Sequence, residues 1–242
     1  MLVQVEVAEP AIDVRQELAH AGMAGTVSWL LGGMFPAYAK IYYPFLEITT
    51  GDRARDESRQ RLNAMLLGIA EPDTAVTRLK ASEVASRLGL AFPPEFNRYS
   101  IPRSKWNMLV FPIGGHVPLH YARMFSDILE STGMQQVCYF RWPAIVAPQP
   151  GLDTIYRGTV GDMIEFVNAG MGRGLMTPEE WVAIDHSWAL NTGDLDFIFA
   201  ALGGDEALID AVVRSQWWEA VRVDGTLRVD MNADRVNRPL EP

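Results

Sequence analysis

The order of apolar and polar positions along the chain predicts a mixture of short helices and strands. Pro118 suits the first turn of the clearest helix and Gly133 its end, while Ser82 and Gly89 can cap and end another helix. Helical spacing or composition predicts the main helices over residues 10–22, 55–69, 80–90, 118–133 and 205–215.

Short runs rich in β-branched and aromatic residues predict the strands. They occupy residues 26–50, 107–113, 135–142 and 187–202, with a last strand at 218–223. Pro44 is expected to break the first run or to place it at a sheet edge, because proline cannot donate a ladder hydrogen bond. Thr192 and Gly193 predict a hairpin turn within the fourth run. The segment 91–106 contains three prolines and is expected to be a loop that covers the core.

Helices and strands follow one another without the regular β-α-β rhythm of a parallel sheet. This order favours the α+β class, with a largely antiparallel sheet flanked by helices. The length of 242 residues suits one large domain or two small ones, and no repeat or clear linker divides the chain. We therefore predict a single domain over residues 1–225, followed by an ill-packed C-terminal tail over residues 226–242.

The net charge of the chain indicates which classes of macromolecule could bind it. The 21 Lys and Arg residues against 30 Asp and Glu residues give a net charge of −9. Nucleic-acid-binding proteins usually carry a basic surface, and the arginines of residues 52–61 alternate with acids instead. We therefore expect no nucleic-acid partner. A basic protein would complement this chain, and a homo-oligomer is compatible with the sequence.

Three features favour a cytoplasmic protein. The single cysteine, Cys138, excludes an internal disulfide framework and fits a reducing compartment. Residues 1–10 have neither the basic start nor the long apolar run of a signal peptide. No stretch approaches the ~20 apolar residues of a membrane span, so we expect no membrane partner.

The stretch from Asp194 to Val213 contains two acidic motifs. Asp194 and Asp196 form a D-x-D pair, and residues 203–206 spell the GGDE of cyclases that make cyclic dinucleotides. Because an amphipathic helical pattern follows Glu206 at once, Asp205 is expected to cap a helix that begins within two residues of it. In a strand, both aspartates of the pair would share the solvent face. The stretch therefore predicts a strand, a turn and a helix rather than a catalytic site.

His116 and His120 are the candidate metal ligands. They lie four residues apart, which is the spacing of a metal-binding pair on a helix. However, Pro118 places the start of the helix between them, and Val117 stands where zincins carry their glutamate. We therefore expect a loop histidine and a first-turn histidine, with no metal and no other cofactor bound.

Asp185 and His186 are the candidate catalytic residues. Adjacent residues of an extended chain face opposite ways, which argues against a catalytic dyad. The sequence contains no G-x-S-x-G nucleophile elbow, no Walker loop and no G-x-G-x-x-G after a strand. Cys138 lies inside a strand pattern, where a buried, unreactive thiol is expected. The sequence thus favours a protein that is not an enzyme, without deciding the question.

Three stretches carry a resemblance to other proteins. They are FPAYAKIYYP (35–44), preceded by a glycine pair, CYFRW (138–142) and TPEEWVAIDHSWALNTGDLDFIFAALGGDEALIDAVV (177–213). Together they resemble a group of uncharacterised actinobacterial proteins. The resemblance implies a bacterial cytosolic protein and supports a strand, a turn and a helix over 194–213. It implies no catalytic residue.

Two functions from different classes stay open at this point. Missing catalytic motifs, an acidic charge and clustered aromatic residues favour a protein-binding or accessory module of the immunity or regulatory kind. Trp and Tyr dominate protein interfaces, and Trp217 and Trp218 form one such cluster. The alternative is a small-molecule-binding protein or a metal-assisted hydrolase that uses His116, His120 and nearby acids.

Overall fold

The structure is a computed structural model that describes eight stretches of the chain. These are residues 3–5, 21–48, 76–112, 117–141, 155–162, 164–165, 178–193 and 197–237. The predicted helix over 55–69 lies outside the described residues, as does nearly all of the predicted helix over 10–22.

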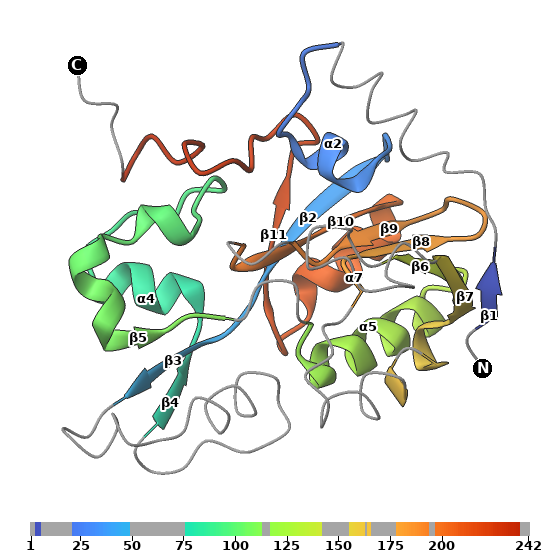
Figure 1. Ribbon diagram of the computed structural model, residues 1–242, viewed down its shortest axis with the longest axis horizontal. Helices are drawn as coiled ribbons and strands as arrows, with labels where there is room; N and C mark the ends of the chain where they lie inside the picture. The colour runs from blue at the N-terminus through green and yellow to red at the C-terminus, as the bar shows by residue number, and fades with distance from the viewer. Residues whose placement is uncertain are drawn as a thin grey trace.

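The described residues form a large antiparallel sheet with helices packed on it (Figure 1). Its eight strands are, in spatial order, β1 (Val3–Val5), β7 (Ile155–Thr159), β6 (Val137–Arg141), β8 (Glu180–Ala183), β9 (Ala189–Asn191), β10 (Phe199–Gly204), β2 (Ala37–Tyr42) and β11 (Glu219–Val223). Every neighbouring pair runs antiparallel. The predicted α+β class with a largely antiparallel sheet is therefore confirmed.

A smaller sheet branches from the large one at Pro44. It contains β4 (Val76–Leu79), β3 (Phe45–Ile48) and β5 (Leu109–Val110), in that order. β2 ends at Tyr42 and β3 begins at Phe45, so the chain leaves one sheet and enters the other across Pro44. The predicted break at this proline is confirmed, because its ring nitrogen has no hydrogen to donate to a ladder.

Helices cover both faces of the large sheet. One face packs against α5 (Leu119–Ser131) and α7 (Glu206–Arg214). The other face packs against α2 (Val27–Leu31) and shares a second hydrophobic core with α4 (Ala81–Arg87) and with the proline-rich segment, which contains the 3-10 turns η2 (Arg98–Ser100) and η3 (Arg103–Met108). β2 contributes side chains to the core on each face of the sheet, because successive side chains of a strand point to opposite faces. Ala39 and Ile41 contact the α5 and α7 side, whereas Tyr38 and Tyr42 contact the other.

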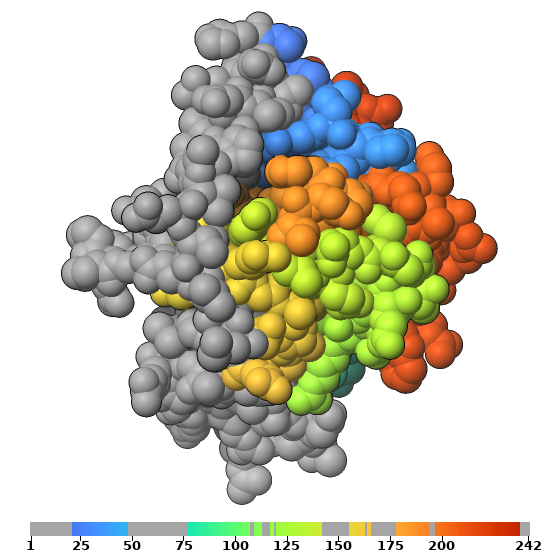
Figure 2. Space-filling model, turned by 90° about the vertical axis from the view of Figure 1, so that its right-hand side faces the viewer, coloured from blue at the N-terminus to red at the C-terminus, as the bar shows by residue number. Residues whose placement is uncertain are grey.

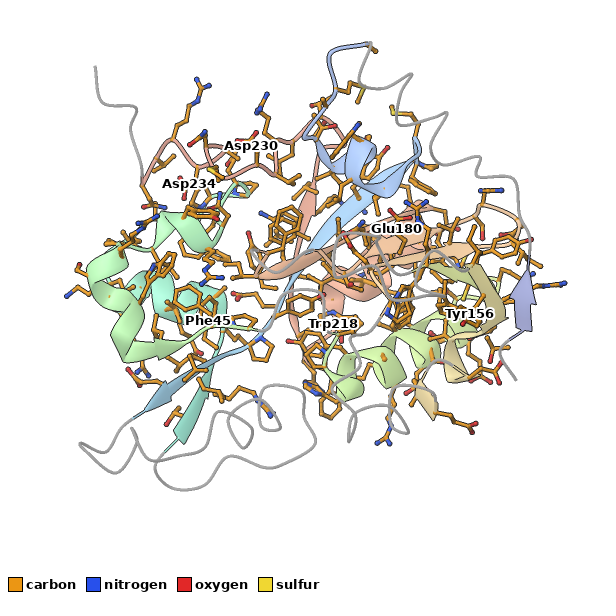
Figure 3. All side chains as sticks on the ribbon, viewed as in Figure 1. Phe45, Tyr156, Glu180, Trp218, Asp230 and Asp234 are labelled. Carbon is orange, nitrogen blue, oxygen red and sulfur yellow. The ribbon has the colours of Figure 1, made fainter. Side chains whose placement is uncertain are left out.

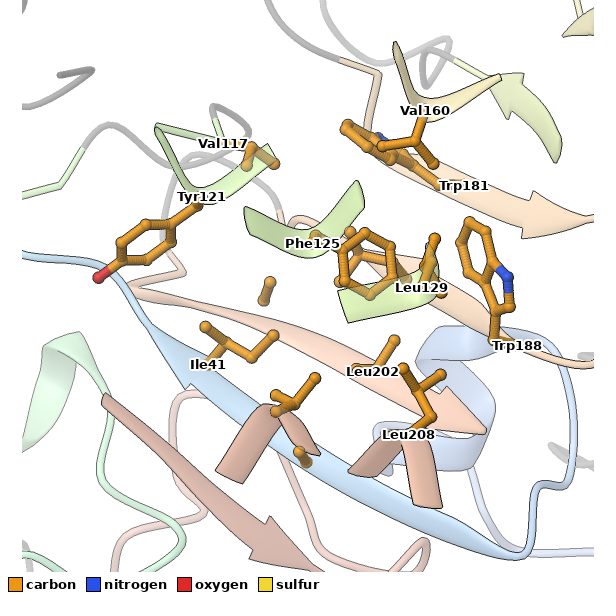
Figure 4. Packing of buried hydrophobic residues seen from close by; sticks show 14 of the residues in the cluster. Ile41, Val117, Tyr121, Phe125, Leu129, Val160, Trp181, Trp188, Leu202 and Leu208 are labelled. Carbon is orange, nitrogen blue, oxygen red and sulfur yellow. The ribbon is translucent and has the colours of Figure 1, made fainter. Parts of the chain in front are cut away.

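The predicted helix over 118–133 is confirmed as α5, which lies at the molecular surface. On the face seen in Figure 2, residues 117–141 in green lie between residues 155–162 in yellow and the C-terminal part of the chain in red. Its inner side presents Tyr121, Phe125 and Leu129 to the core (Figure 4). The ring of Phe125 stands edge-on to that of Trp188, with 5.2 Å between the ring centroids.

The strand predicted at residues 26–31 is wrong, since Val27–Leu31 is the helix α2. The hydroxyl of Thr26 accepts a hydrogen bond from the Trp29 amide at 3.3 Å, which caps the first turn. Gly32 ends the helix in the left-handed conformation, at φ +64°. The β-branched and aromatic composition predicted a strand, but these two caps and the contacts of the helix with β9 and β10 favour the helix.

The N-cap of α4 also differs from its prediction. The helix begins at Ala81, so Lys80 and not Ser82 is the N-cap residue. The amide of Lys80 donates to the carboxylate of Glu83 at 2.7 Å, and the amide of Ser82 donates to that of Glu219 at 3.1 Å. Carboxylates thus satisfy free amides that a serine hydroxyl was expected to satisfy.

Gly203 and Gly204 lie inside β10, so the turn expected there is wrong, whereas a turn does follow β9 at Gly193, with φ +74°. The glycine pair is explained by packing. A Cβ atom on Gly203 would lie 2.4 Å from the ring of Phe35, and one on Gly204 would lie 2.7 Å from Leu208. Only glycine lets these side chains approach the strand so closely.

The segment after β11 is packed, contrary to the expected loose tail. Val229 and Asp234 are buried, and the Asn97 side chain donates to the carbonyl of Asp230 at 3.4 Å. Figure 3 shows Asp230 and Asp234 on this segment. Asn237 exchanges two hydrogen bonds with the backbone of residue 91. Residues 226–237 are therefore part of the fold, while the domain boundary at 225 stays a prediction.

Candidate functional site

A cleft of about 1200 Å³ opens where the two sheets meet α5 and α7. Its walls come from β4, from one side of α5 and from the loop that joins α7 to β11. Residues far apart in sequence, such as Arg78, His120 and Trp217, meet there. Two other hollows, beside β11 and beside η3, are smaller, at about 270 and 320 Å³.

One side of α5 lines the cleft along the whole length of the helix. The lining residues of this helix are His120, Tyr121, Met124, Asp127, Ile128 and Ser131. His120, Met124, Asp127 and Ser131 recur every three or four positions, which is the spacing of neighbours on one helix face. Arg123 and Glu130 of the same helix are exposed and do not line the cleft.

His120 is a half-buried imidazole in the first turn of α5. Its ring packs edge-on against Tyr121, with 4.6 Å between the ring centroids. Burial, and then the positive charge of Arg78, lowers the pKa of His120 to about 4, so the ring is neutral at neutral pH. Its Nδ1 atom is buried and makes no hydrogen bond within the described part of the chain. A buried polar atom without a partner costs roughly 1–3 kcal/mol.

The floor of the cleft is made of tyrosines that are held by backbone carbonyls. The hydroxyl of Tyr121 donates to the carbonyl of Tyr42 at 3.2 Å, and that of Tyr43 donates to the carbonyl of Thr192 at 2.9 Å. Burial raises the pKa of all three of these tyrosines. They therefore stay neutral and supply a rigid apolar floor rather than reactive groups.

The two adjacent tryptophans have different environments. Trp218 is buried between α5 and the end of α7, near the middle of the molecule (Figure 3). Its indole N–H donates to the carbonyl of Val212 at 2.7 Å, and its ring packs against Tyr121 at 5.5 Å between centroids. Trp217 also lines the cleft but is 67% exposed. The buried Trp218 therefore forms part of the cleft wall, whereas the ring of Trp217 is accessible to a ligand.

Charged residues of both signs line the cleft, and most have protein partners. Glu83 and Glu219 accept the two amides at the start of α4, and Arg214 forms an ion pair with Asp210 at 2.7 Å. Arg78 is also engaged within the protein. The ammonium of Lys80 and the carboxylate of Asp127 are the exceptions, because neither makes a hydrogen bond or ion pair within the residues that the structure describes.

Asp185 and His186, the candidate catalytic residues, lie in the tight turn between β8 and β9. Both are exposed, and His186 adopts φ +58°. Asp185 accepts hydrogen bonds from the amide and hydroxyl of Ser187, at 3.0 and 2.6 Å, which lower the pKa of its carboxyl. Neither residue lines the cleft. In this structure they shape a turn.

Only one of the two candidate metal ligands lies within the described residues. His120 lines the cleft, whereas His116 lies outside the described residues, as do Asp194 and Asp196. Within the described ranges, no three His, Cys, Asp or Glu side chains are placed to hold one metal ion. Nor does any helix in those ranges have the length and apolarity to cross a membrane.

The predicted cap at Asp205 is confirmed. Its carboxylate accepts the amide of Leu208 at 2.7 Å, and α7 begins at Glu206. Glu206 in turn forms an ion pair with Arg222 on β11. Cys138 is buried as predicted, and burial raises the pKa of its thiol. The contacts of these three residues stabilise the fold.

Comparison with protein-family models, with curated proteins and with solved structures gives no match. Any proposal for function must therefore start from the geometry of the cleft.

Sequence analysis found only part of this site. His120 and Trp217 were singled out, but Arg78 and Asp127 were not, because each looks like an ordinary surface charge in its own segment. One signal was present in the sequence, since His120, Met124, Asp127 and Ser131 form a stripe along one side of the predicted helix. Whether such a stripe faces solvent or a cleft depends on neighbours from other segments.

Proposed function

We propose that the protein binds a small organic ligand in this cleft and does not transform it. A mostly apolar hollow with a few convergent polar groups is the usual form of a small-molecule site. The observation that carries the proposal is His120, a half-buried, neutral imidazole that lines the cleft and whose Nδ1 atom makes no hydrogen bond within the described residues. A ligand in the cleft can hydrogen-bond the imidazole, and a rotation of the ring that brings Nδ1 to the ligand would remove the cost of leaving that nitrogen unsatisfied.

The chemistry of the described lining supports binding rather than catalysis. Its tyrosines have raised pKa values and hydroxyls that are engaged with carbonyls. The neutral imidazole of His120 has no carboxylate bound to it among the described residues, so nothing there would orient it as a general base. Hydrogen bonding and aromatic contact remain as its means of recognition.

His120→Phe should abolish ligand binding without harming the fold. Phenylalanine keeps the ring contact with Tyr121 and removes the unsatisfied nitrogen, so the free energy of unfolding should stay the same or rise. A library of amino acids, organic acids, amines and nucleosides is screened by calorimetry and by tryptophan fluorescence, which responds at Trp217. We expect at least one ligand whose affinity falls tenfold or more in this variant, about 1.4 kcal/mol.

His186→Asn is the matched control, because it removes a different imidazole and asparagine tolerates positive φ. Its ligand affinity should equal that of the unchanged protein. A ligand that binds equally well to His120→Phe, or a screen in which nothing binds, contradicts the proposal.

A second candidate is a protein partner, and the exposure of Trp217 favours it. An exposed tryptophan beside a hollow is typical of the residues that dominate binding energy at interfaces. The net charge of −9 would speed encounter with a basic protein. This follows the leading sequence-based hypothesis of a binding or accessory module.

Trp217→Ala should weaken such a complex at least tenfold, while His120→Phe leaves it intact. The measurement is a titration of a purified basic partner, isolated by co-purification, against both variants at low and high salt. If Trp217→Ala binds that partner as tightly as the unchanged protein, this surface is not the interface.

A further inference from the structure

The lining of the cleft changes in charge from one end of α5 to the other. His120 lies in the first turn of the helix and Asp127 two turns further on. At 1.5 Å per residue, seven residues separate them by about 10 Å along the helix axis. Met124 and Ile128 lie on the same face between them and provide an apolar stretch.

The end near His120 favours a negative group. Arg78 acts on His120 as a nearby positive charge, and Lys80 lines the cleft from the same strand end. The start of α5 adds the positive end of a helix dipole, and its first turn carries no acidic residue. Glu83 and Glu219 also line the cleft, but their carboxylates accept the amides at the start of α4, and the positive end of that helix offsets part of their charge.

The end near Asp127 favours a positive group. The carboxylate of Asp127 has no partner among the described residues, and no basic residue occupies the last turn of α5. The helix dipole is negative at this end. Arg214 lines the cleft as well, but its guanidinium is paired with Asp210 through its Nη2 atom and with the Asp210 carbonyl through Nε.

We infer that the ligand is a zwitterion that lies along α5, with its anionic group near Arg78 and His120 and its cationic group at Asp127. The inference rests on the proposed function and names the class of ligand. An ω-amino acid, or a basic amino acid whose side chain reaches Asp127, has the required arrangement. Its carbon chain would lie on Met124 and Ile128.

A series of simple probes tests the charge pattern. Glycine, 4-aminobutanoate, 6-aminohexanoate and 8-aminooctanoate vary the distance between the two charges, while hexanoate and hexylamine each keep one charge. Affinities for the full chain are measured by calorimetry at pH 7. We expect one of the longer amino acids to bind at least tenfold more tightly than glycine, hexanoate and hexylamine.

Substitutions at two sites of α5 locate the cationic group. Asp127→Asn should remove the advantage of the amino acid over hexanoate, whereas Glu130→Gln, an acid of the same helix that faces away from the cleft, should leave it unchanged. Asp127→Lys should reverse the preference, so that adipate binds more tightly than 6-aminohexanoate. Both sites are on the surface of α5, and a melting curve shows that each variant is folded.

The outcomes separate this inference from the proposed function. If hexanoate or hexylamine binds as tightly as every amino acid and His120→Phe still weakens it, the cleft binds ligands and only the zwitterion is wrong. If Asp127→Asn and Glu130→Gln behave alike, the cationic group is not at Asp127. If neither these probes nor the broader library binds, the proposed function fails as well.

Discussion

Replacing Trp188 by alanine should lower the free energy of unfolding by about 3–5 kcal/mol, the usual cost of removing a large buried aromatic ring. Trp188 directly precedes β9. Its side chain is fully buried and packs against Phe125 of α5 (Figure 4). Its indole N–H donates to the carbonyl of Gln135 at 2.8 Å. The substitution therefore leaves both a cavity and an unpaired carbonyl, and urea denaturation measures the loss.

Trp217→Ala is the matched control for this prediction. The same ring is removed, but from a side chain that is 67% exposed. Surface substitutions of this kind usually change stability by no more than about 0.5 kcal/mol. Equal losses in the two variants would contradict the described packing of α5 on the sheet.

Lys40 should make the protein more stable as the pH rises from 7 to 9. This lysine, on β2, is fully buried, and its ammonium donates to the carbonyls of Pro94 and Phe96 at 2.7 and 3.0 Å. It also lies 4.0 Å from the centre of the Phe199 ring. Burial lowers its pKa from 10.5 to about 7, although the charges of Glu95 and Asp234 raise it in part.

The sign of the effect follows from the protons bound by each state. Between pH 7 and 10.5 the unfolded chain keeps the proton on Lys40 while the folded protein releases it, so stability increases with pH in that window. Between pH 7 and 9 the gain is about 2 kcal/mol. The raised pKa of the Cys138 thiol and of the buried tyrosines acts in the opposite direction at alkaline pH.

Comparison with Lys40→Met isolates this contribution, because the cysteine and the tyrosines are the same in both proteins. The free energy of unfolding is measured at pH 7, 8 and 9 for the two proteins. Their difference should change by about 2 kcal/mol over this range. Lys105→Met, at an exposed lysine, should show no such change. Parallel pH profiles for Lys40→Met and the unchanged protein would mean that Lys40 keeps an ordinary pKa.

The sequence predicted correctly those helices whose first and last turns contain capping or terminating residues. α5 and α7 were predicted correctly because an amphipathic pattern and a starting proline or capping aspartate agree in each segment. Pro44 marked the change of sheet because the missing N–H acts wherever the residue lies. β1, β4, β7 and β8 were missed, since each has only three to five residues and shows little periodicity.

By itself, the sequence determined the class of fold, the principal helices, the cap at Asp205 and the burial of Cys138. These depend on interactions within one turn or on the apolar character of one segment. Only the tertiary structure decided that Thr26 begins a helix, that Gly203 and Gly204 lie within a strand, and that residues 226–237 are packed. It alone brought Arg78 and Asp127 to one cleft, because contacts between distant segments depend on sheet order and helix placement, which no local pattern encodes.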